Sequence, residues 1–329
     1  MKNLDDPVQT FLESLKPGTR DIYAYGLKEF QQFYQPQGTV SQFIDRVQID
    51  LKQTDWKEKQ KVAQNTLRDF SVNLQAKGLA PTSVRSYVSS VQAMLKFYLE
   101  VKVALFKGTV PASITLTRPY PWTLQTVNQF IESMTDPMYK SLSSLAFQSG
   151  LGMYEALNLT YQDIQEEYEN NVCPLCLDFG VKTRKKTLYP FLTFIGSWAI
   201  RKLQTYMKTK TWNPDMRLYP VGKEAVDAYF RKTAKPFLGH WQGRNPMRFH
   251  SLRTAFKTIS TDAKVVDRLY IEFFMGHAKP GKHVEETYIS KTREAWRTEY
   301  AKLEPHLTPP TSSSSDEKPL EEQVKANII

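Results

Sequence analysis

Helical patterns run through almost the whole chain, and a single short stretch near residues 172–194 predicts β-structure. Up to about residue 110, apolar side chains recur every three or four residues, as expected for amphipathic helices at 22–33, 58–75 and 84–98. Within the β-forming stretch, residues 180–190 have the pattern of a hairpin, with two β-prone runs around a basic turn. The sequence therefore predicts a mainly α-helical protein with a small antiparallel β-sheet.

A break in composition divides the chain into two domains. The length of 329 residues is enough for two separate cores. Residues 107–121 are rich in proline and threonine and have little helical periodicity, which indicates a linker. We expect helical and catalytic domains at 1–110 and 121–307, a linker at 111–120, and a disordered tail at 308–329, whose serine-rich and acidic sequence cannot bury a core.

Turn residues indicate where some helices begin and end. Thr19 follows a Pro-Gly pair and is predicted to cap the first strong helical pattern, and residues 78–82 end one helix and cap the next. Residues 121–124 open a helix after the linker. Residues 188–200, the longest apolar run, predict a buried strand followed by the start of a helix.

The charge balance favours a polyanionic partner. The net charge is +10, and Lys and Arg side chains that neutralise phosphates release counterions and so drive binding to nucleic acid. Many basic proteins bind no nucleic acid, so charge alone leaves the partner open. No run approaches the roughly 18 apolar residues of a membrane span, and the N-terminus lacks the apolar region of a secretory signal. We expect no membrane association and a cytoplasmic, nucleoid-associated location.

The two cysteines, Cys173 and Cys176, have the Cys-x-x-Cys spacing of metal or redox sites. Tetrahedral zinc needs four ligands, and no second Cys or His pair follows at a zinc-ribbon distance. We therefore expect no metal and interpret the pair as part of a turn between two strands.

Four residues of the second half form an ordered series that suits a phosphodiester substrate. His250, Arg253, His277 and Tyr288 supply imidazoles to move protons, a guanidinium to hold non-bridging oxygens, and a phenol oxygen to attack phosphorus. A tyrosine with an ordinary pKa near 10 needs neighbouring cations to act as a nucleophile at neutral pH. The series is therefore a candidate phosphoryl-transfer site.

These residues stand in segments that resemble a known family. His250-Ser251-Leu252-Arg253, Met275-Gly276-His277 and the segment around Tyr288 resemble the tyrosine recombinases, integrase-like enzymes that cut DNA through a 3′-phosphotyrosyl intermediate. Residues 19–30 and 80–84 are similar to the helical core-binding (SAM-like) domain of that family, which clamps DNA. The resemblance implies such a DNA-binding domain at 1–110 and a mixed α/β catalytic domain at 121–307.

The resemblance also implies a role for each site residue. Tyr288 would be the nucleophile, Arg253 would hold non-bridging oxygens, His250 would manage protons, and His277 would contact a non-bridging oxygen. Lys182, on the predicted hairpin, would protonate the 5′-hydroxyl leaving group.

Further residues are candidates for supporting roles. Tyr300 is an alternative nucleophile, although it lies too far along a helical pattern to match the family. Arg85, Arg184 and Lys185 are expected to bind DNA.

One position departs from the family. Where the family signature resembles Thr-Gly-Leu-Arg-Ile-Ser-Glu-Leu, the chain has Gly152 in place of the first catalytic arginine, while Glu155 and the surrounding leucines still fit. Loss of one donor to a developing oxyanion typically lowers the rate about 10²–10³-fold. Three explanations stay open: a natural or engineered inactivating change, an impaired but surviving site, or replacement by another cation such as Arg184 or Lys185.

The sequence thus supports an enzyme of DNA recombination and integration, belonging to a mobile element and impaired or inactivated at residue 152. Such an enzyme would act as a homotetramer on two double-stranded DNA sites and need no cofactor, because the phosphotyrosine conserves the bond energy. An inactive DNA-binding protein with the same fold is the alternative, and a type IB topoisomerase, which fits this two-domain layout poorly, is a third. We also expect a helix at 293–307 that packs on a neighbouring subunit, from Trp296 and Leu303.

Overall fold

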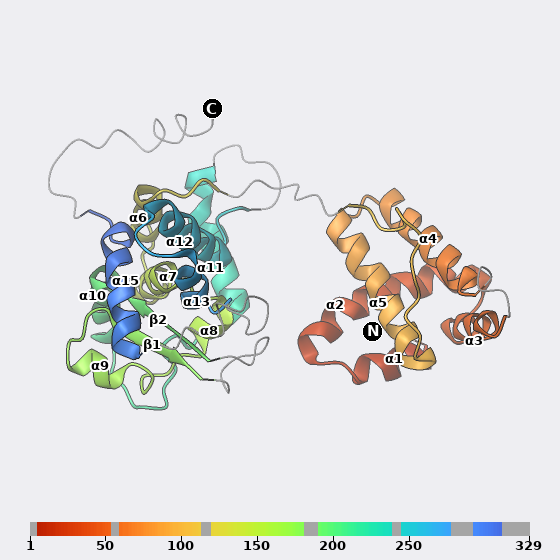
Figure 1. Ribbon diagram of the computed structural model, residues 1–329, viewed down its shortest axis with the longest axis horizontal. Helices are drawn as coiled ribbons and strands as arrows, with labels where there is room; N and C mark the ends of the chain where they lie inside the picture. The colour runs from red at the N-terminus through yellow and green to blue at the C-terminus, as the bar shows by residue number, and fades with distance from the viewer. Residues whose placement is uncertain are drawn as a thin grey trace. The chain divides into compact units, whose positions relative to one another are not determined.

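The computed structural model describes residues 5–53, 59–112, 120–180, 190–238, 245–277 and 292–310. The chain divides into two compact units, Met1–Leu116 and Thr117–Ile329, and each unit has its own hydrophobic core (Figure 1). The structure is mainly helical with a two-stranded antiparallel sheet, which confirms the predicted fold class. No described helix has the length and apolar character needed to cross a membrane.

The first unit is a bundle of helices around an aromatic cluster. Phe30 lies fully buried at its centre and contacts the rings of Tyr34, Phe43 and Phe70. The helix predicted to begin after Thr19 begins earlier, at Pro17, and its N-cap is Lys16. The fixed φ of proline suits the first position of a helix. The helices of this unit are α1 (Asp6–Glu13), α2 (Pro17–Tyr34), α3 (Val40–Leu51), α4 (Lys61–Ala76) and α5 (Pro81–Leu99), with a 3₁₀ turn at Gln35–Gln37.

Close contact between α2 and α5 depends on a glycine. A Cβ on Gly26 would lie 2.8 Å from the Cα of Tyr87 and 2.5 Å from the hydroxyl oxygen of Ser90. Side chains of any size would force the two helices apart at this point. Gly26 therefore sets the spacing of the helix pair that organises the bundle.

The second unit is built around one central helix. Its elements are α6 (Leu124–Glu132), α7 (Pro137–Ser149), α8 (Met153–Leu157), α9 (Gln165–Glu169), β1 (Leu175–Phe179), β2 (Phe191–Ile195), α10 (Ser197–Met207), α11 (Lys223–Leu238), α12 (Phe249–Ala263), α13 (Arg268–Phe274) and α15 (Arg293–Leu307). The last nine residues of α7 are all buried, and α7 packs against α6, α10, α12 and β2. A helix buried on all sides must satisfy its polar side chains internally.

Gln148 shows how α7 does so. Its amide oxygen accepts hydrogen bonds from the backbone N–H groups of Gly196 and Ala199, and its amide nitrogen donates to the carbonyl of Leu307. The side chain of Gln148 thereby joins the start of α10 to the end of α15. These contacts place the C-terminal helix on the core of its own unit.

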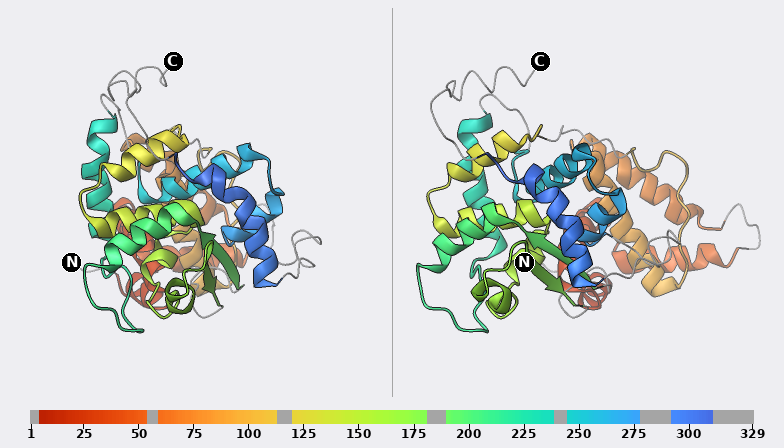
Figure 2. Two further views of the ribbon diagram at one scale, coloured as in Figure 1. Left: turned by 90° about the vertical axis from the view of Figure 1, so that its left-hand side faces the viewer. Right: turned by 60° about the vertical axis from the view of Figure 1, so that its left-hand side comes forward.

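The sheet pairs β1 and β2 as an antiparallel ladder, with Leu175 opposite Ile195 and Phe179 opposite Phe191. The strands flank the predicted hairpin segment, and residues 181–189 lie outside the described residues. β2 is followed directly by α10, as the apolar run at 188–200 predicted. α15 packs against β2 (Figure 2).

The helix at 293–307 forms as predicted, but the reason given for a neighbouring subunit is wrong. Trp296 is 3% exposed and Leu303 is fully buried, so both side chains belong to the core of their own unit. Trp296 stacks on Phe273 with ring centroids 3.9 Å apart. These two residues are therefore not available to a second subunit.

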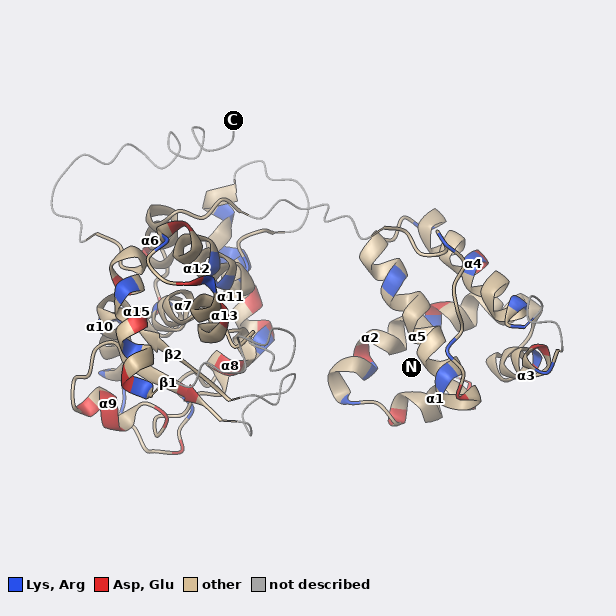
Figure 3. Cartoon of the chain, in the orientation of Figure 1, with Lys and Arg blue, Asp and Glu red and all other residues tan. Residues whose placement is uncertain are grey.

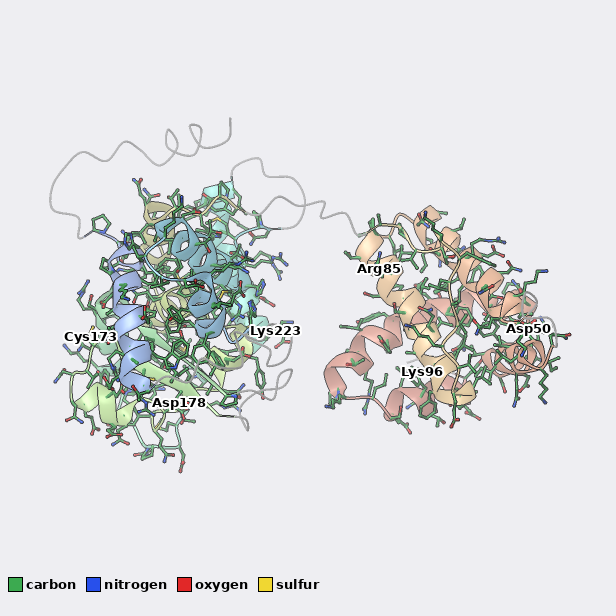
Figure 4. The ribbon with its side chains drawn as sticks, in the orientation of Figure 1. Asp50, Arg85, Lys96, Cys173, Asp178 and Lys223 are labelled. Atoms are coloured by element: carbon green, nitrogen blue, oxygen red, sulfur yellow. The ribbon has the colours of Figure 1, made fainter. Side chains whose placement is uncertain are left out.

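The interpretation of the cysteine pair as a turn between strands is also wrong. Cys173 precedes β1, near α15, and its thiol approaches Glu304 at 3.8 Å (Figure 4), whereas Cys176 lies within β1 itself. Burial raises the pKa of Cys173 to about 11 and that of Cys176 to about 12, so both thiols are protonated at neutral pH. Within the described ranges, no three His, Cys, Asp or Glu side chains gather to hold a metal.

Candidate functional site

Arg253 links three segments of the second unit. It lies on α12, and its Nη1 donates to the carbonyl of Gly150 at 2.5 Å, in the turn after α7. Its Nη2 donates to the carbonyl of Met275 at 2.7 Å and contacts Nε2 of His277 at 2.5 Å. The guanidinium is thus held rigidly between the 150 turn and the end of α13.

Gly276 explains how His277 reaches Arg253. Gly276 has φ of 65°, in the left-handed region that favours glycine. The N–H of Gly276 donates to the carbonyl of Phe273, and the N–H of His277 donates to the carbonyl of Glu272, which together form a Schellman motif. The chain therefore turns sharply at the end of α13 and presents His277 immediately after the helix.

Glu272 orients the imidazole of His277. The Nδ1 of His277 lies 2.9 Å from Oε2 of Glu272, while Nε2 faces Arg253. A guanidinium only donates hydrogen bonds and a carboxylate only accepts them. The contacts therefore assign a neutral imidazole with the proton on Nδ1 and the lone pair of Nε2 directed at Arg253.

The pKa shifts agree with this protonation state. Burial and the charge of Arg253 lower the pKa of His277, and Glu272 offsets them only in part. Burial alone would raise the pKa of Glu272, but hydrogen bonds from Lys257 and His277 outweigh it and hold that pKa below its usual range. At neutral pH the cluster thus consists of a neutral imidazole and an ionised carboxylate between cations.

Glu272 and Lys257 are the residues that sequence reasoning missed. Lys257 lies one turn after Arg253 on α12, and its Nζ is 2.6 Å from Oε1 of Glu272. Arg268 is a more distant partner of the same carboxylate, at 3.8 Å. The sequence does contain a signal for Glu272. When a helix ends at a glycine, the residue four positions before the glycine comes close to the residue that follows the glycine.

His250 lies on the first turn of α12, three residues before Arg253, and its side chain is exposed. This spacing puts the two residues on the same face of the helix. Sequence position alone thus brings His250 to the same end of α12 as the Arg253 and His277 pair.

The turn that carries residue 152 lies beside Arg253. Gly150 ends α7 with φ of 66°, and a Cβ there would lie 2.5 Å from the ring of Phe256. Glycine is thus required at position 150, because φ is left-handed and there is no room for a Cβ. The carbonyl of Gly150 accepts a hydrogen bond from Arg253.

The backbone conformation at position 152, in contrast, does not require glycine. It is the N-cap of α8 with φ of −76°, which any residue adopts. A Cβ there would approach only the carboxylate end of Glu155, with Oε2 at 2.6 Å. Because that carboxylate is the far end of a flexible side chain, a Cβ at position 152 requires only that the carboxylate of Glu155 shift.

Several predicted site residues lie outside the described residues. These are Tyr288, Lys182, Arg184 and Lys185. Tyr300, the alternative nucleophile, is described: it is fully buried, its hydroxyl donates to the carbonyl of Gln148 at 2.8 Å, and burial raises its pKa well above the usual value. Tyr300 is therefore a structural residue, and it is not poised to attack a substrate.

Arg85 belongs to the first unit. It lies exposed on α5, and its Nη2 donates to the carbonyl of Pro111 at 3.3 Å. Lys and Arg side chains are also carried by α11 and α15 of the second unit (Figure 3).

Comparison with known proteins bears on the fold. No protein-family model matches the chain, and no curated protein matches it. Among solved structures, the Tn1549 transposon integrase in complex with circular intermediate DNA is 15% identical, with a TM-score of 0.54 over 90% of this chain and 99% of that one. The XerH site-specific recombinase bound to palindromic difH substrate is 14% identical, with a TM-score of 0.54 over 84% of this chain and 77% of that one.

A lambda integrase dimer bound to a COC′ core site is 14% identical, with a TM-score of 0.54 over 85% of this chain and 97% of that one. The chain has the tyrosine-recombinase fold. In this chain, Arg253 joins the three segments whose sequences resemble motifs of that family. These segments are the 150 turn, the first turns of α12 and the end of α13.

The arrangement around Arg253 suits an anion with several acceptor oxygens. A guanidinium and an imidazole lie side by side, with a lysine one turn away. Planar guanidinium groups hold two oxygens of a phosphate at once. These side chains have the charge and the hydrogen-bond donors that a phosphodiester site requires.

Proposed function

We propose that the chain is a DNA recombinase of the tyrosine type, which breaks and rejoins DNA through a 3′-phosphotyrosyl intermediate. The observation that carries the proposal is the contact of Arg253 with both His277 and the turn that ends in Gly152. The residues of three separate motifs thus meet at one guanidinium.

In the proposed reaction, the phenol oxygen of Tyr288 attacks phosphorus, and the bond from phosphorus to the 5′ oxygen breaks. Arg253 and His277 hold the non-bridging oxygens, and His250 handles the proton of the attacking tyrosine. Lys182 gives a proton to the departing 5′ oxygen. Religation reverses these steps with a 5′-hydroxyl as the nucleophile, so no cofactor is consumed.

Gly152 favours a second candidate, a DNA-binding protein that does not cut. The missing guanidinium would remove two donors and one charge from the transition state, and one lost donor typically costs about 10²–10³-fold. We therefore expect strand cleavage by this chain to be impaired or absent. Glu155, whose carboxylate borders position 152, would support an arginine placed there.

The proposed substrate is double-stranded DNA. The net charge of +10 supports it, and Arg85 on α5 is a candidate contact of the first unit. The similar structures named above are described as complexes with DNA. We further propose a mobile-element enzyme that assembles as a tetramer on two DNA sites, with the first unit as a core-binding domain and the second as the catalytic domain.

The test is covalent trapping on nicked duplexes taken from the sequences that flank this chain's gene. We would compare the chain as it is with Gly152→Arg, and each of these with Tyr288→Phe. Gly152→Gln is the matched control, because it adds an unbranched polar side chain with hydrogen-bond donors but no charge. We expect an adduct with Gly152→Arg that is at least about 10²-fold more abundant than with Gly152→Gln and is lost with Tyr288→Phe.

Each outcome decides between the candidates. A Tyr288-dependent adduct from the unchanged chain would mean a working recombinase that has replaced its first arginine. An adduct from Gly152→Arg alone would mean an inactivated DNA-binding protein. DNA binding without any adduct from either chain would contradict Tyr288 as the nucleophile.

A further inference from the structure

Glu272 is the residue that no motif of the sequence assigns and that nevertheless controls the orientation of His277. Its carboxylate accepts from Nδ1 of His277 through one oxygen and pairs with Lys257 through the other. The backbone carbonyl of Glu272 also accepts from the N–H of His277. One residue therefore holds the histidine at both its backbone and its ring.

We propose that Glu272 is a positioning residue that makes His277 take up a proton when a phosphate enters the site. The inference rests on the proposed function and adds a residue and a proton to it. In the structure, Nε2 of His277 presents a lone pair to Arg253. A phosphate oxygen only accepts hydrogen bonds, so this nitrogen must acquire a proton before it can contact the substrate.

Two routes give Nε2 a proton, and Glu272 decides between them. If the proton simply moved from Nδ1, the bare Nδ1 would face the carboxylate of Glu272 at 2.9 Å, lone pair against lone pair. If instead a proton is taken from solvent, Nδ1 keeps its own proton and the imidazolium lies between two anions, Glu272 and the phosphate. The carboxylate therefore favours the charged imidazolium over a change of tautomer.

The surrounding charges determine when this happens. Arg253 and Lys257 from α12 face the pair from one side, and Glu272, with Arg268 as its distant partner, faces it from α13. β2, which packs on α13, carries no titratable residue. With no anion bound, the two nearby cations oppose protonation. A bound phosphate removes that opposition, so proton uptake is coupled to binding.

The mechanism has a consequence for pH. Binding that requires proton uptake weakens as pH rises above the pKa of the free imidazole. Because the pKa of the free imidazole is lowered, the proposed cleavage step should slow as pH rises through that lowered value, starting below about pH 6.5, and Glu272→Gln should be slower and less dependent on pH. We expect a loss of at least about tenfold in the rate of adduct formation for Glu272→Gln in the Gly152→Arg background.

The first arm of the test needs no DNA. Nitrogen NMR of His277 reports its tautomer and its pKa in the free protein, with and without sulfate, which carries two charges over this pH range and mimics the phosphate. We expect a proton on Nδ1, a pKa that sulfate raises, and a smaller increase in Glu272→Gln. Glu132→Gln is the matched control, because Glu132 is also a carboxylate paired with cations, in its case Lys140 and Lys202 on other helices.

The outcomes separate this inference from the proposed function. An unchanged tautomer and an equal response to sulfate in Glu272→Gln would overturn the inference, as would a His277 that does not respond to sulfate at all. If adducts form equally fast in Glu272→Gln and Glu132→Gln, the recombinase stands and the role of Glu272 falls. If the NMR results hold but no DNA adduct ever forms, the anion site stands and the recombinase falls. Rescue by Glu272→Asp would show that charge, rather than packing, is what His277 needs.

Discussion

At the scale of single residues, two glycines in one turn have opposite requirements. Gly150 has φ of 66° and leaves no room for a Cβ beside Phe256, whereas Gly152 has an ordinary φ of −76°. Position 150 is therefore fixed by backbone geometry. Position 152 has no such requirement, and a Cβ there would displace only the carboxylate of Glu155.

The two positions predict different responses to alanine. Gly150→Ala combines a left-handed backbone with a contact of 2.5 Å to Phe256, so the free energy of unfolding should fall by at least about 2 kcal/mol. Gly152→Ala is the control and should lower it by only about 1 kcal/mol, because alanine is a poorer N-cap than glycine but adopts this φ without strain. Urea denaturation of both variants gives the comparison. Equal losses would contradict the geometry of the turn.

The chemistry of individual residues also marks the limit of sequence reasoning. The types and order of His250, Arg253 and His277 suggested a shared site, and the structure brings Arg253 and His277 into contact. Glu272 could not be assigned in the same way, because its importance comes from the Schellman motif at Gly276, which folds the helix end back toward it. Tyr300 shows the reverse case, because only the structure reveals that its ring is buried.

At the scale of elements, the periodicity of apolar residues predicted where helices form better than it predicted which elements pack against them. The helix at Arg293–Leu307 and the paired strands formed where apolar patterns predicted them. Trp296 and Leu303 did not support the predicted contact with a second subunit, because an apolar face shows that a helix is covered without showing what covers it. Here the cover is α12, β2 and the end of α13, the last through Trp296.

The pairing of α2 with α5 leads to an element-scale prediction. Gly26→Ala would place a methyl group 2.8 Å from the Cα of Tyr87, so we expect a loss of about 1–3 kcal/mol in the free energy of unfolding of the first unit. Gly18→Ala, in the same helix with nothing within 4 Å, should instead leave stability unchanged or raise it by up to about 1 kcal/mol. Thermal unfolding followed by circular dichroism measures both. A neutral Gly26→Ala would mean that the helices are not in close contact.

At the scale of the whole molecule, the protonation state of His277 makes stability depend on pH. Its pKa is lowered in the folded state, so the unfolded chain binds the proton more readily. The stabilisation is complete above the ordinary pKa of histidine, about 6.5, and is lost as pH falls through the lowered value.

We therefore expect the melting temperature to fall between about pH 7.5 and pH 5.5 and to fall less in His277→Gln. Three carboxylates with lowered pKa values reduce stability further, but only at more acidic pH: Glu132, Glu167 and Glu272. Calorimetry of both proteins across this range gives the answer. A greater decrease in His277→Gln would mean that His277 is charged in the folded protein.

The central claim is that Arg253 and His277 form a phosphodiester site used by Tyr288, and the most direct test is to locate the DNA on the protein. The Gly152→Arg chain would be trapped on nicked duplex, digested and analysed by mass spectrometry, alongside Arg253→Gln and Tyr300→Phe in the same background. The account predicts a 3′-phosphonucleotide on the peptide that contains Tyr288, lost with Arg253→Gln and kept with Tyr300→Phe. A nucleotide on any other residue, or an undiminished adduct in Arg253→Gln, would contradict it.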